Sequence, residues 1–438
     1  MSRPMKDSGI EWIGEIPQEW GVIKFKYLFN IIGGNGFPET LQGKTEGEYP
    51  FCKVSDINGS SAFVSSANNY VSEKTVSEYK FNIIPSNSIL MAKIGAALRK
   101  NHRKINVVPC CIDNNTQALV SKRADNIKYL YYLSQIINME WFDNNSTVPS
   151  INNGKLLLFF VPNVKNDEQK RIADFLDRKS AEIDTVIKKT EESIEEYKKL
   201  KQSIITEAVT KGIRPGRKMK PSGIEWIGDI PEEWERRKLK SFTSVISKGA
   251  TPTDMSLVND NKYTVAFVKG ESIVNGLVSY EKCNYITEEA DAKLSRSRLQ
   301  KDDILFVIAG SIGKCGIVKE LIMPTNINQA IAFVRLYKEY QHLNRYIRYY
   351  FESNYSVTYY SLNTVRSALP NLSMEDLSNM YVSLPKDKKE IDEIVDFLDR
   401  KSTEIDKLIE AKQKIVEEMQ TYKKSVIYEY VTGKKEVS

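Results

Sequence analysis

The sequence predicts an α+β fold, in which two mixed α/β domains are separated by a long antiparallel two-helix coiled coil, with pseudo-two-fold internal duplication. A long amphipathic segment occurs twice, a short tryptophan-containing segment occurs twice, and the two stretches between them share an order of strand-like and helix-like runs. The expected division is an N-terminal joint at 1–20, a first domain at 21–162, a central long helix at 163–213, a linker and second joint at 214–234, a second domain at 235–385 and a C-terminal long helix at 386–438.

The chain opens with a joint segment, MKDSGIEWIGEIPQEW at 5–20, which returns with three changes as MKPSGIEWIGDIPEEW at 219–234. Such close similarity indicates that one unit of joint, globular stretch and long helix has been duplicated. Each copy brings two tryptophans, Trp12 and Trp20 in the first and Trp226 and Trp234 in the second. We expect these rings to pack against the helix ends or a partner, and the alternative is a ligand-binding aromatic box.

The two globular stretches share a pattern of secondary structure but little sequence. In the first, runs at 25–32 and 88–94 are β-like, and 126–142 has the pattern of a helix. In the second, 303–309 matches the strand at 88–94, and 344–355 is the matching helix. The divergence of these stretches beside nearly unchanged joints indicates a shared frame that carries two different functions.

The long segments, 166–211 and 387–433, superpose without a gap after a shift of 222 positions, and both contain DFLDRKS. Their apolar residues recur at intervals of 3, 4 and 7, which places them along one stripe of a helix. A helix of this length extends for roughly 65 Å, and the simplest burial for its stripe is against its own copy. Asn166 with Gln169, and Asp387 with Glu390, have the spacing of a capping box. Gly212 and Gly433 follow the last periodic residues.

Composition excludes several classes of protein. The chain has 438 residues, of which 41% are hydrophobic, yet it contains no apolar run long enough for a membrane span and no signal peptide, so we expect a cytoplasmic protein that does not bind membranes. Its five cysteines and two histidines lack metal-ligand spacing, which predicts reduced thiols and no metal site.

The net charge of +6 lies in the globular stretches. Residues 21–160 carry +5 and residues 235–386 carry +5, so the helices and joints together are acidic. A basic excess confined to two domains favours a polyanionic partner bound there. The alternative is a chance excess of surface lysines.

No catalytic motif is present. GSIGKCG at 310–316 does not have the spacing of a phosphate loop, and IIGGNG at 31–36 is an equally poor dinucleotide fingerprint, so both are expected to be strand-end turns. There is also no NPPY-type methyltransferase motif. The chain is therefore expected to bind without catalysing a reaction and to hold no cofactor.

Candidate DNA contacts occur at corresponding places in the two domains, as basic or small polar residues around the turns that follow strands. Arginine and lysine reach phosphates or guanine edges, and asparagine and glutamine pair with adenine edges. The alternative is that the amides cap turns and the basic residues are solvated. The candidates are Lys93, Arg99, Lys100, Arg103, Lys104, Asn114 and Gln117 in the first domain, and Lys248, Thr251, Lys269, Ser311, Lys314, Asn326, Asn328 and Gln329 in the second.

With its duplicated SGIEWIG joints, its EQ start at Glu168 and Gln169, its two DFLDRKS helices and its two dissimilar basic domains, the chain resembles the specificity subunit of type I restriction-modification enzymes over essentially its full length. The SKGATPT stretch at 247–253 and the NINQA stretch at 326–330 also resemble this family. The first domain departs from the pattern, since it has Gly95-Ala96-Ala97-Leu98 where the second has a GxxG loop at 310–313.

The resemblance implies a non-catalytic subunit of a hetero-oligomer that binds double-stranded DNA. Each domain would be a target recognition domain reading one half of a split site, while the long helices hold the domains apart and bind two methyltransferase subunits, which are joined by motor-nuclease subunits. S-adenosylmethionine, ATP and Mg²⁺ then belong to these partners. Two other hypotheses are a coiled-coil scaffold that binds only proteins and an enzyme with an unrecognised site.

The duplication also predicts where the chain ends lie. Because the first long helix leads through a short linker into the second joint, the second long helix is expected to end beside the first joint, near Met5. The two helices then run antiparallel. Two recognition domains bound to one face of a DNA duplex are expected to lie roughly 34 Å apart, centre to centre.

Overall fold

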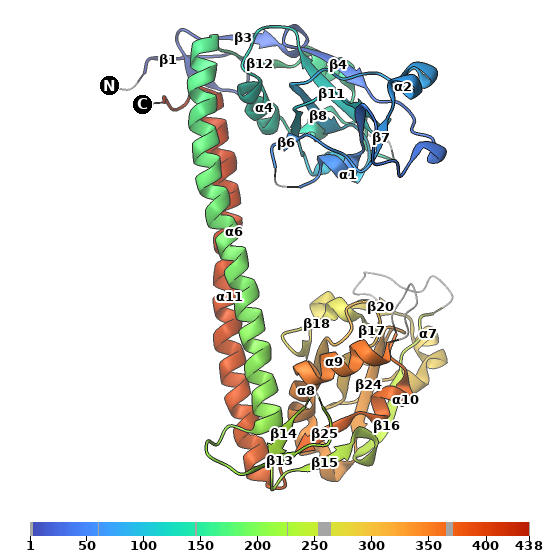
Figure 1. Ribbon diagram of the computed structural model, residues 1–438. Coiled ribbons are helices and arrows are strands. Elements are labelled where there is room, and N and C mark those ends of the chain that lie inside the picture. Colours follow the sequence, from blue (N-terminus) through green and yellow to red (C-terminus); the bar gives the residue numbers. More distant parts are fainter. Residues whose placement is uncertain are drawn as a thin grey trace. The chain divides into compact units, whose positions relative to one another are not determined.

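The structure is a computed structural model that describes residues 3–59, 61–144, 147–225, 227–252, 264–364 and 371–437. The chain forms two compact units, Met1–Thr190 with Lys414–Ser438 and Glu191–Gln413. Each unit contains a joint, one mixed α/β domain and one half of each long helix (Figure 1). This architecture confirms the predicted α+β fold.

Two short strand pairs form each joint and its connection to the domain. In the first unit β1 (Met5–Asp7) pairs with β2 (Glu15–Pro17), and β3 (Gly21–Lys24) pairs with β12 (Phe160–Asn163), both antiparallel. The second unit repeats this arrangement. Its pairs are β13 (Met219–Pro221) with β14 (Asp229–Pro231) and β15 (Glu235–Lys238) with β25 (Tyr381–Leu384).

The first domain contains a five-stranded sheet of order β4-β11-β8-β9-β6 and a three-stranded sheet of order β10-β5-β7. All pairs are antiparallel except β6 with β9 and β10 with β5. The strands are β4 (Phe29–Gly33), β5 (Tyr49–Cys52), β6 (Phe63–Val64), β7 (Tyr70–Val71), β8 (Ser88–Ala92), β9 (Lys104–Asn106), β10 (Cys111–Ile112) and β11 (Thr116–Ser121).

The second domain has the same topology with one added edge strand. Its sheets have the orders β16-β24-β21-β22-β19-β18 and β20-β17-β23, and the two parallel pairs, β19 with β22 and β17 with β23, recur at the corresponding places. The strands are β16 (Thr243–Lys248), β17 (Val265–Val268), β18 (Ile273–Val274), β19 (Leu277–Val278), β20 (Asn284–Ile286), β21 (Ile304–Val307), β22 (Cys315–Ile317), β23 (Thr325–Ile327) and β24 (Ile331–Leu336).

Short helices cover these sheets, and two of them end earlier than predicted. The helix expected at 126–142 ends at Ile136, because Asn138 caps a separate 3-10 turn, and the helix expected at 344–355 ends at Glu352, because Ser353 caps the next helix. The run at 25–32 likewise begins with a 3-10 turn before β4. The helices are α1 (Val54–Ile57), α2 (Glu73–Tyr79), α3 (Ala96–Arg99), α4 (Ile127–Ile136), α5 (Asn153–Leu158), α7 (Glu288–Lys293), α8 (Asn344–Glu352), α9 (Asn354–Asn363) and α10 (Met374–Asn379).

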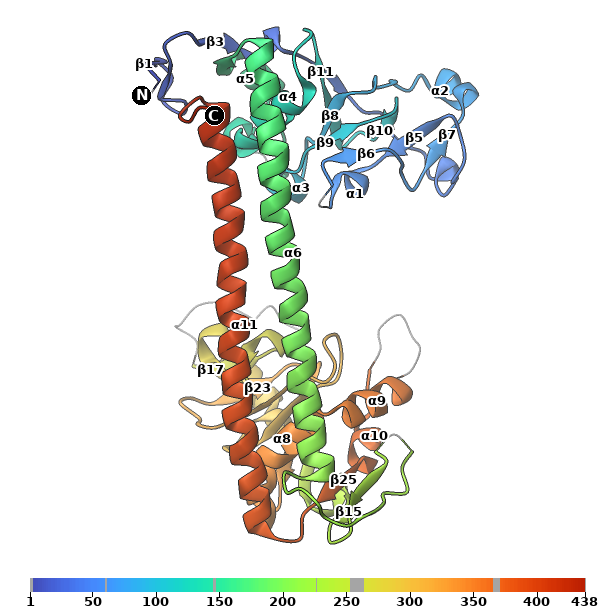
Figure 2. The ribbon, with the colours of Figure 1, turned by 60° about the vertical axis from the view of Figure 1, so that its left-hand side comes forward.

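The long helices are α6 (Asn166–Lys211) and α11 (Lys388–Val431), and they pack together antiparallel within each unit (Figure 2). In the first unit the ring centroids of Phe175 and Tyr430 are 4.3 Å apart, and Lys423 Nζ lies 2.7 Å from Asp184. In the second unit Lys201 Nζ lies 2.7 Å from Asp406. The predicted helix pair is therefore confirmed.

The apolar stripe is only partly buried. Leu176 and its counterpart Leu398 are fully buried, whereas four stripe residues are 45–47% exposed, so pairing with the other copy buries only part of the stripe. A two-helix seam is narrow, and residues at its margin remain accessible unless a third element covers them. The exposed residues are Val186, Leu200, Leu408 and Tyr422.

The predicted capping boxes do not form. The Gln169 amide donates to the carbonyl of Val164 and to Asp125, and its oxygen accepts from the Asn126 backbone, so this side chain ties the helix start to the domain. At the second helix Asp387 accepts from the Lys389 backbone, as an N-cap does, but Glu390 pairs with Arg217.

Two joint tryptophans, Trp20 and Trp234, pack against the helix starts, as predicted. Trp20 Nε1 donates to Glu168 at 2.8 Å, and Trp234 Nε1 donates to Glu390 at 3.2 Å. Trp12 stacks on Phe159 with ring centroids 5.1 Å apart. Trp226 lies outside the described residues.

The end of α11 lies beside the first joint, which confirms the expectation for the chain ends. Lys434 Nζ donates to the carbonyls of Ile13 and Glu15, each at 2.7 Å, and the Tyr428 hydroxyl donates to the carbonyl of Trp12 at 3.0 Å.

No helix in the described part of the chain is long and apolar enough to cross a membrane.

Candidate nucleic-acid interface

Loops that follow the strands of the second domain meet in one place. The Gly249 amide after β16 donates to the Ile331 carbonyl at 3.0 Å, and the Asn328 amide donates to the Val268 carbonyl at the end of β17 at 3.2 Å. A Cβ on Gly249 would collide with the carbonyls of Ile327 and Asn328. The glycine of the SKGATPT stretch is therefore required by close backbone packing between these loops. Thr253, the last residue of that stretch, lies outside the described residues.

The loop between β21 and β22 joins this cluster through Lys314. Its Nζ donates to the Gly270 carbonyl at 2.7 Å, and burial, followed by the charge of Lys282, lowers the pKa of Lys314. Gly310 and Gly313 have φ of +79° and +94°, so the GSIGKCG segment is a strand-end turn, as predicted.

Most candidates of the second domain reach solvent in this cluster. The exposed ones include Gln329 and Thr251, whose hydroxyl donates to the Gln329 side-chain oxygen. Lys269 and Asn328 are half-buried. The remaining exposed candidates are Lys248, Ser311 and Lys314.

Asn326 is fully buried and cannot contact DNA in this structure. Its oxygen accepts from the Ser297 hydroxyl at 2.6 Å, and its amide donates to Asp291 at 2.8 Å and to the Leu294 carbonyl at 3.0 Å. The amide therefore stabilises the domain, and the sequence-based assignment to DNA is corrected.

The first domain builds the same loop cluster. The Gly34 amide after β4 donates to the Thr116 carbonyl at 3.1 Å, and a Cβ on Gly34 would collide with the carbonyls of Ile112 and Asp113. The IIGGNG segment is thus a strand-end turn, as predicted. Around it Arg99, Lys100 and Asn114 are exposed and Lys93 is half-buried, while Arg99 lies 3.3 Å from Glu140.

Three candidates of the first domain are buried. Arg103, with 5% exposure, donates to the carbonyl of His102 and to Asn101, and burial lowers its pKa to about 9, so it stays charged near pH 7. Lys104 lies within β9 with 7% exposure. Gln117 is fully buried and accepts from Asn153 at 3.1 Å. We therefore correct the expectation that these three side chains reach DNA directly.

The strand pairing defines which residues of the two domains occupy equivalent positions. Gln117 pairs with Gly33, and Ala332 pairs with Lys248, so Gln117 corresponds to Ala332. Three positions earlier, Asn114 corresponds to Gln329. Asp113 then corresponds to Asn328, and each accepts a hydrogen bond at 3.2 Å from the backbone amide two residues later.

Two residues outside the candidate set predicted from the sequence belong to the cluster, Lys53 and His102. Lys53 follows β5 as Lys269 follows β17, and the backbone amide of each donates to a side chain three residues later. His102 occupies the position equivalent to that of Lys314. Leu90 pairs with Lys104, two residues after His102, and the equivalent Leu305 pairs with Gly316, two residues after Lys314. Burial and then Lys100 lower the pKa of His102, and its Nδ1 lies 3.2 Å from Asn58.

The described residues of the cluster include cations and amides but no group of metal-ligating side chains. In the described ranges no three His, Cys, Asp or Glu residues gather as metal ligands, and all five cysteines are free buried thiols. Exposed cations and amides around two glycine turns can contact phosphates and base edges.

A family model described as "Type I restriction modification DNA specificity domain" matches residues 17–196 and 231–418. The MjaVIII specificity subunit of Methanocaldococcus jannaschii is 24% identical over 430 residues, which cover 96% of this chain and 93% of that relative. The EcoBI specificity subunit of Escherichia coli is 28% identical over 228 residues, or 50% of this chain and 46% of the relative.

One solved structure supports the fold. Its description is "Structural basis underlying complex assembly and conformational transition of the type I R-M system", and its matching chain has a TM-score of 0.64 at 13% identity, over 95% of this chain and 98% of the other.

Proposed function

The chain belongs to the type I restriction-modification DNA specificity family, and from this premise we propose that each of its two domains reads one half of a bipartite double-stranded DNA target. Bound to DNA in this way, the chain directs adenine methylation or restriction by partner subunits. Its own role is recognition, and the chemistry belongs to the partners.

The observation that carries this proposal is one loop cluster built twice with different side chains. Two backbone hydrogen bonds recur in both clusters. Gly34 donates to Thr116 as Gly249 donates to Ile331, and Asp113 donates to Cys52 as Asn328 donates to Val268. At equivalent positions of the two clusters, the first domain has Asn114 and His102 where the second has Gln329 and Lys314. A shared backbone with different donors and acceptors suits two readers of different base sequences.

The proposed contacts are the accessible members of each cluster. The cations position the domain on phosphates, and the amides and hydroxyls contact base edges. Buried candidates are left out, and the two residues found from the structure are added. The set is Lys53, Lys93, Arg99, Lys100, His102 and Asn114 in the first domain and Lys248, Thr251, Lys269, Ser311, Lys314, Asn328 and Gln329 in the second.

The proposed partners are two methyltransferase subunits bound to the duplicated frame, with motor-nuclease subunits joined through them. Two copies of the joint and helix offer two equivalent protein surfaces, which supports a pair of identical partners. S-adenosylmethionine, ATP and Mg²⁺ are assigned to these partners.

The test is to express the chain with its methyltransferase partners and map methylated adenines genome-wide. We expect methylation at one split sequence with a fixed unread spacer, and none from the purified chain alone. Turnover by the chain alone, or DNA affinity that does not depend on salt, would favour an unrecognised enzyme or a protein-only scaffold instead.

A further inference from the structure

A cavity of about 810 Å³ lies in the second unit, between the end of α6, the linker that follows it and the second joint. Its apolar lining includes Ile204, Ala208, Ile227 and Phe397. Glu207, Lys211 and Asp229 supply charges at its surface. A volume of this size is typical of ligand-binding clefts, and none of the loops of the candidate nucleic-acid interface contributes to it.

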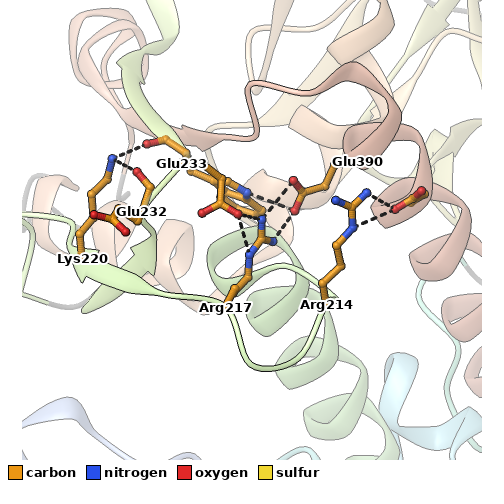
Figure 3. Close-up of polar contacts among 8 residues, drawn as sticks. Arg214, Arg217, Lys220, Glu232, Glu233 and Glu390 are labelled. Atoms are coloured by element: carbon orange, nitrogen blue, oxygen red, sulfur yellow. Dashed lines mark hydrogen bonds and ion pairs between the residues drawn. The ribbon is translucent and has the colours of Figure 1, made fainter.

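Ion pairs hold the linker that forms one wall of the cavity (Figure 3). Arg214 lies 2.6 Å from Glu393, and Arg217 pairs with both Glu233 and Glu390. Gly212 has φ of +75°, and a Cβ there would meet the Arg217 guanidinium. The wall is therefore shaped before anything binds, which lowers the entropic cost of binding.

The first unit fills the corresponding place with its own aromatic ring. The shift of 222 positions relates Phe397 to Phe175 and Ala208 to Tyr430. Tyr430 covers Phe175 with ring centroids 4.3 Å apart. Phe397 and Phe175 are both half-buried, but among the described residues no aromatic ring stacks on Phe397. Among the described residues, the alanine at position 208 therefore leaves Phe397 without the stacked ring that Tyr430 provides for Phe175.

We propose that this cavity binds an aromatic side chain of a protein segment, stacked on Phe397 as Tyr430 stacks on Phe175. The segment comes from a partner subunit, and the inference rests on the proposed function for the existence of that partner. Tilted aromatic pairs add stabilisation beyond the apolar area that they bury.

The first test uses N-acetyl-L-tyrosinamide as the probe and N-acetyl-L-leucinamide as its aliphatic match, with saturation-transfer NMR on the full chain. We expect stronger binding of the tyrosine probe. Ala208→Tyr, which copies the first unit, should weaken it about tenfold by filling the cavity. Equal binding of the two probes, or no effect of Ala208→Tyr, would overturn the proposal.

A matched variant in the other unit sharpens the test. Tyr430→Ala opens the corresponding place over Phe175 and should add a second site for the tyrosine probe. If Tyr430→Ala does not fold, Phe397→Leu replaces it, since removal of the aromatic floor should abolish the preference for tyrosine over leucine. A preference that persists in Phe397→Leu would contradict stacking on this ring.

The second test compares the free chain with the chain assembled with its methyltransferase partners. A partner's aromatic residue in the cavity should exclude the tyrosine probe from the complex. Undiminished binding of the probe to the complex would show that no partner segment occupies the cavity. Mapping of methylated adenines by the same complex separately tests the proposed function.

Discussion

At the scale of single residues, two amide side chains three positions apart, Asn326 and Gln329, lie in opposite environments. Asn326 is buried among Ser297, Asp291 and a backbone carbonyl, whereas Gln329 is exposed in the loop cluster of the second domain. The sequence placed both in one group, because spacing along a chain does not show which way a side chain points until the strand register is known.

Exchange of each amide for alanine separates these roles. Asn326→Ala should lower the free energy of unfolding by about 1–3 kcal/mol, since it leaves buried partners unpaired. Gln329→Ala should leave stability unchanged but cost about 1–3 kcal/mol in discrimination at one base pair. Denaturant unfolding and binding to single-substituted duplexes measure the two effects. A stability loss in Gln329→Ala would contradict its placement.

Lys314 is predicted to contact a phosphate. Lys314→Ala should reduce the slope of log binding constant against log salt concentration by about one unit. Lys319, exposed at the other end of β22, is the matched control, and Lys319→Ala should leave the slope unchanged. Titrations at several salt concentrations decide the question, and equal slopes for the two variants would remove Lys314 from the interface.

His102 is predicted to link DNA binding to pH. Burial and the neighbouring Lys100, Arg103 and Lys104 lower its pKa, which favours the neutral imidazole in the free chain. A DNA phosphate would raise that pKa again, so binding takes up a proton and affinity should increase about tenfold as the pH falls from roughly 8 to 6. Asn58, whose side-chain oxygen lies 3.2 Å from His102 Nδ1, does not titrate. His102→Gln should abolish the dependence, and its persistence in that variant would exclude this histidine.

At the scale of elements, the long helices were the most predictable part of the fold. The apolar residues recur regularly along helices of 46 and 44 residues, and the predicted bounds of 166–211 and 387–433 lie within two residues of the observed ones. The helix starts were less predictable. Gln169 has the correct spacing for a capping box, but tertiary partners from the domain use its amide instead.

The pairing of α6 with α11 predicts unequal costs along the apolar stripe. Leu176→Ala and Leu398→Ala remove fully buried side chains at equivalent positions, and each should destabilise the chain by about 2–5 kcal/mol. Val186→Ala, on the exposed margin of the stripe, should change stability by less than about 0.5 kcal/mol. Chemical denaturation of the three variants provides the measurement. A large loss in Val186→Ala would mean that this margin is covered.

At the scale of the whole molecule, duplication was readable from the sequence because the joints and helices have hardly changed. The common order of strands and helices in the two domains was readable in part, but the pairing and register of their strands were not, since the domains retain few common residues outside the strand anchors. The choice of contact residues was the least predictable, because it depends on that register at each loop.

The most direct test of the account is an exchange of domain 21–162 for that of a relative with a different target, followed by mapping of methylated adenines in cells that also express the methyltransferase partners. If each domain reads its own half-site, one half of the recognised sequence should change while the other half stays the same. A chimaera that folds and methylates but alters both halves, or neither, would contradict independent reading by the two domains.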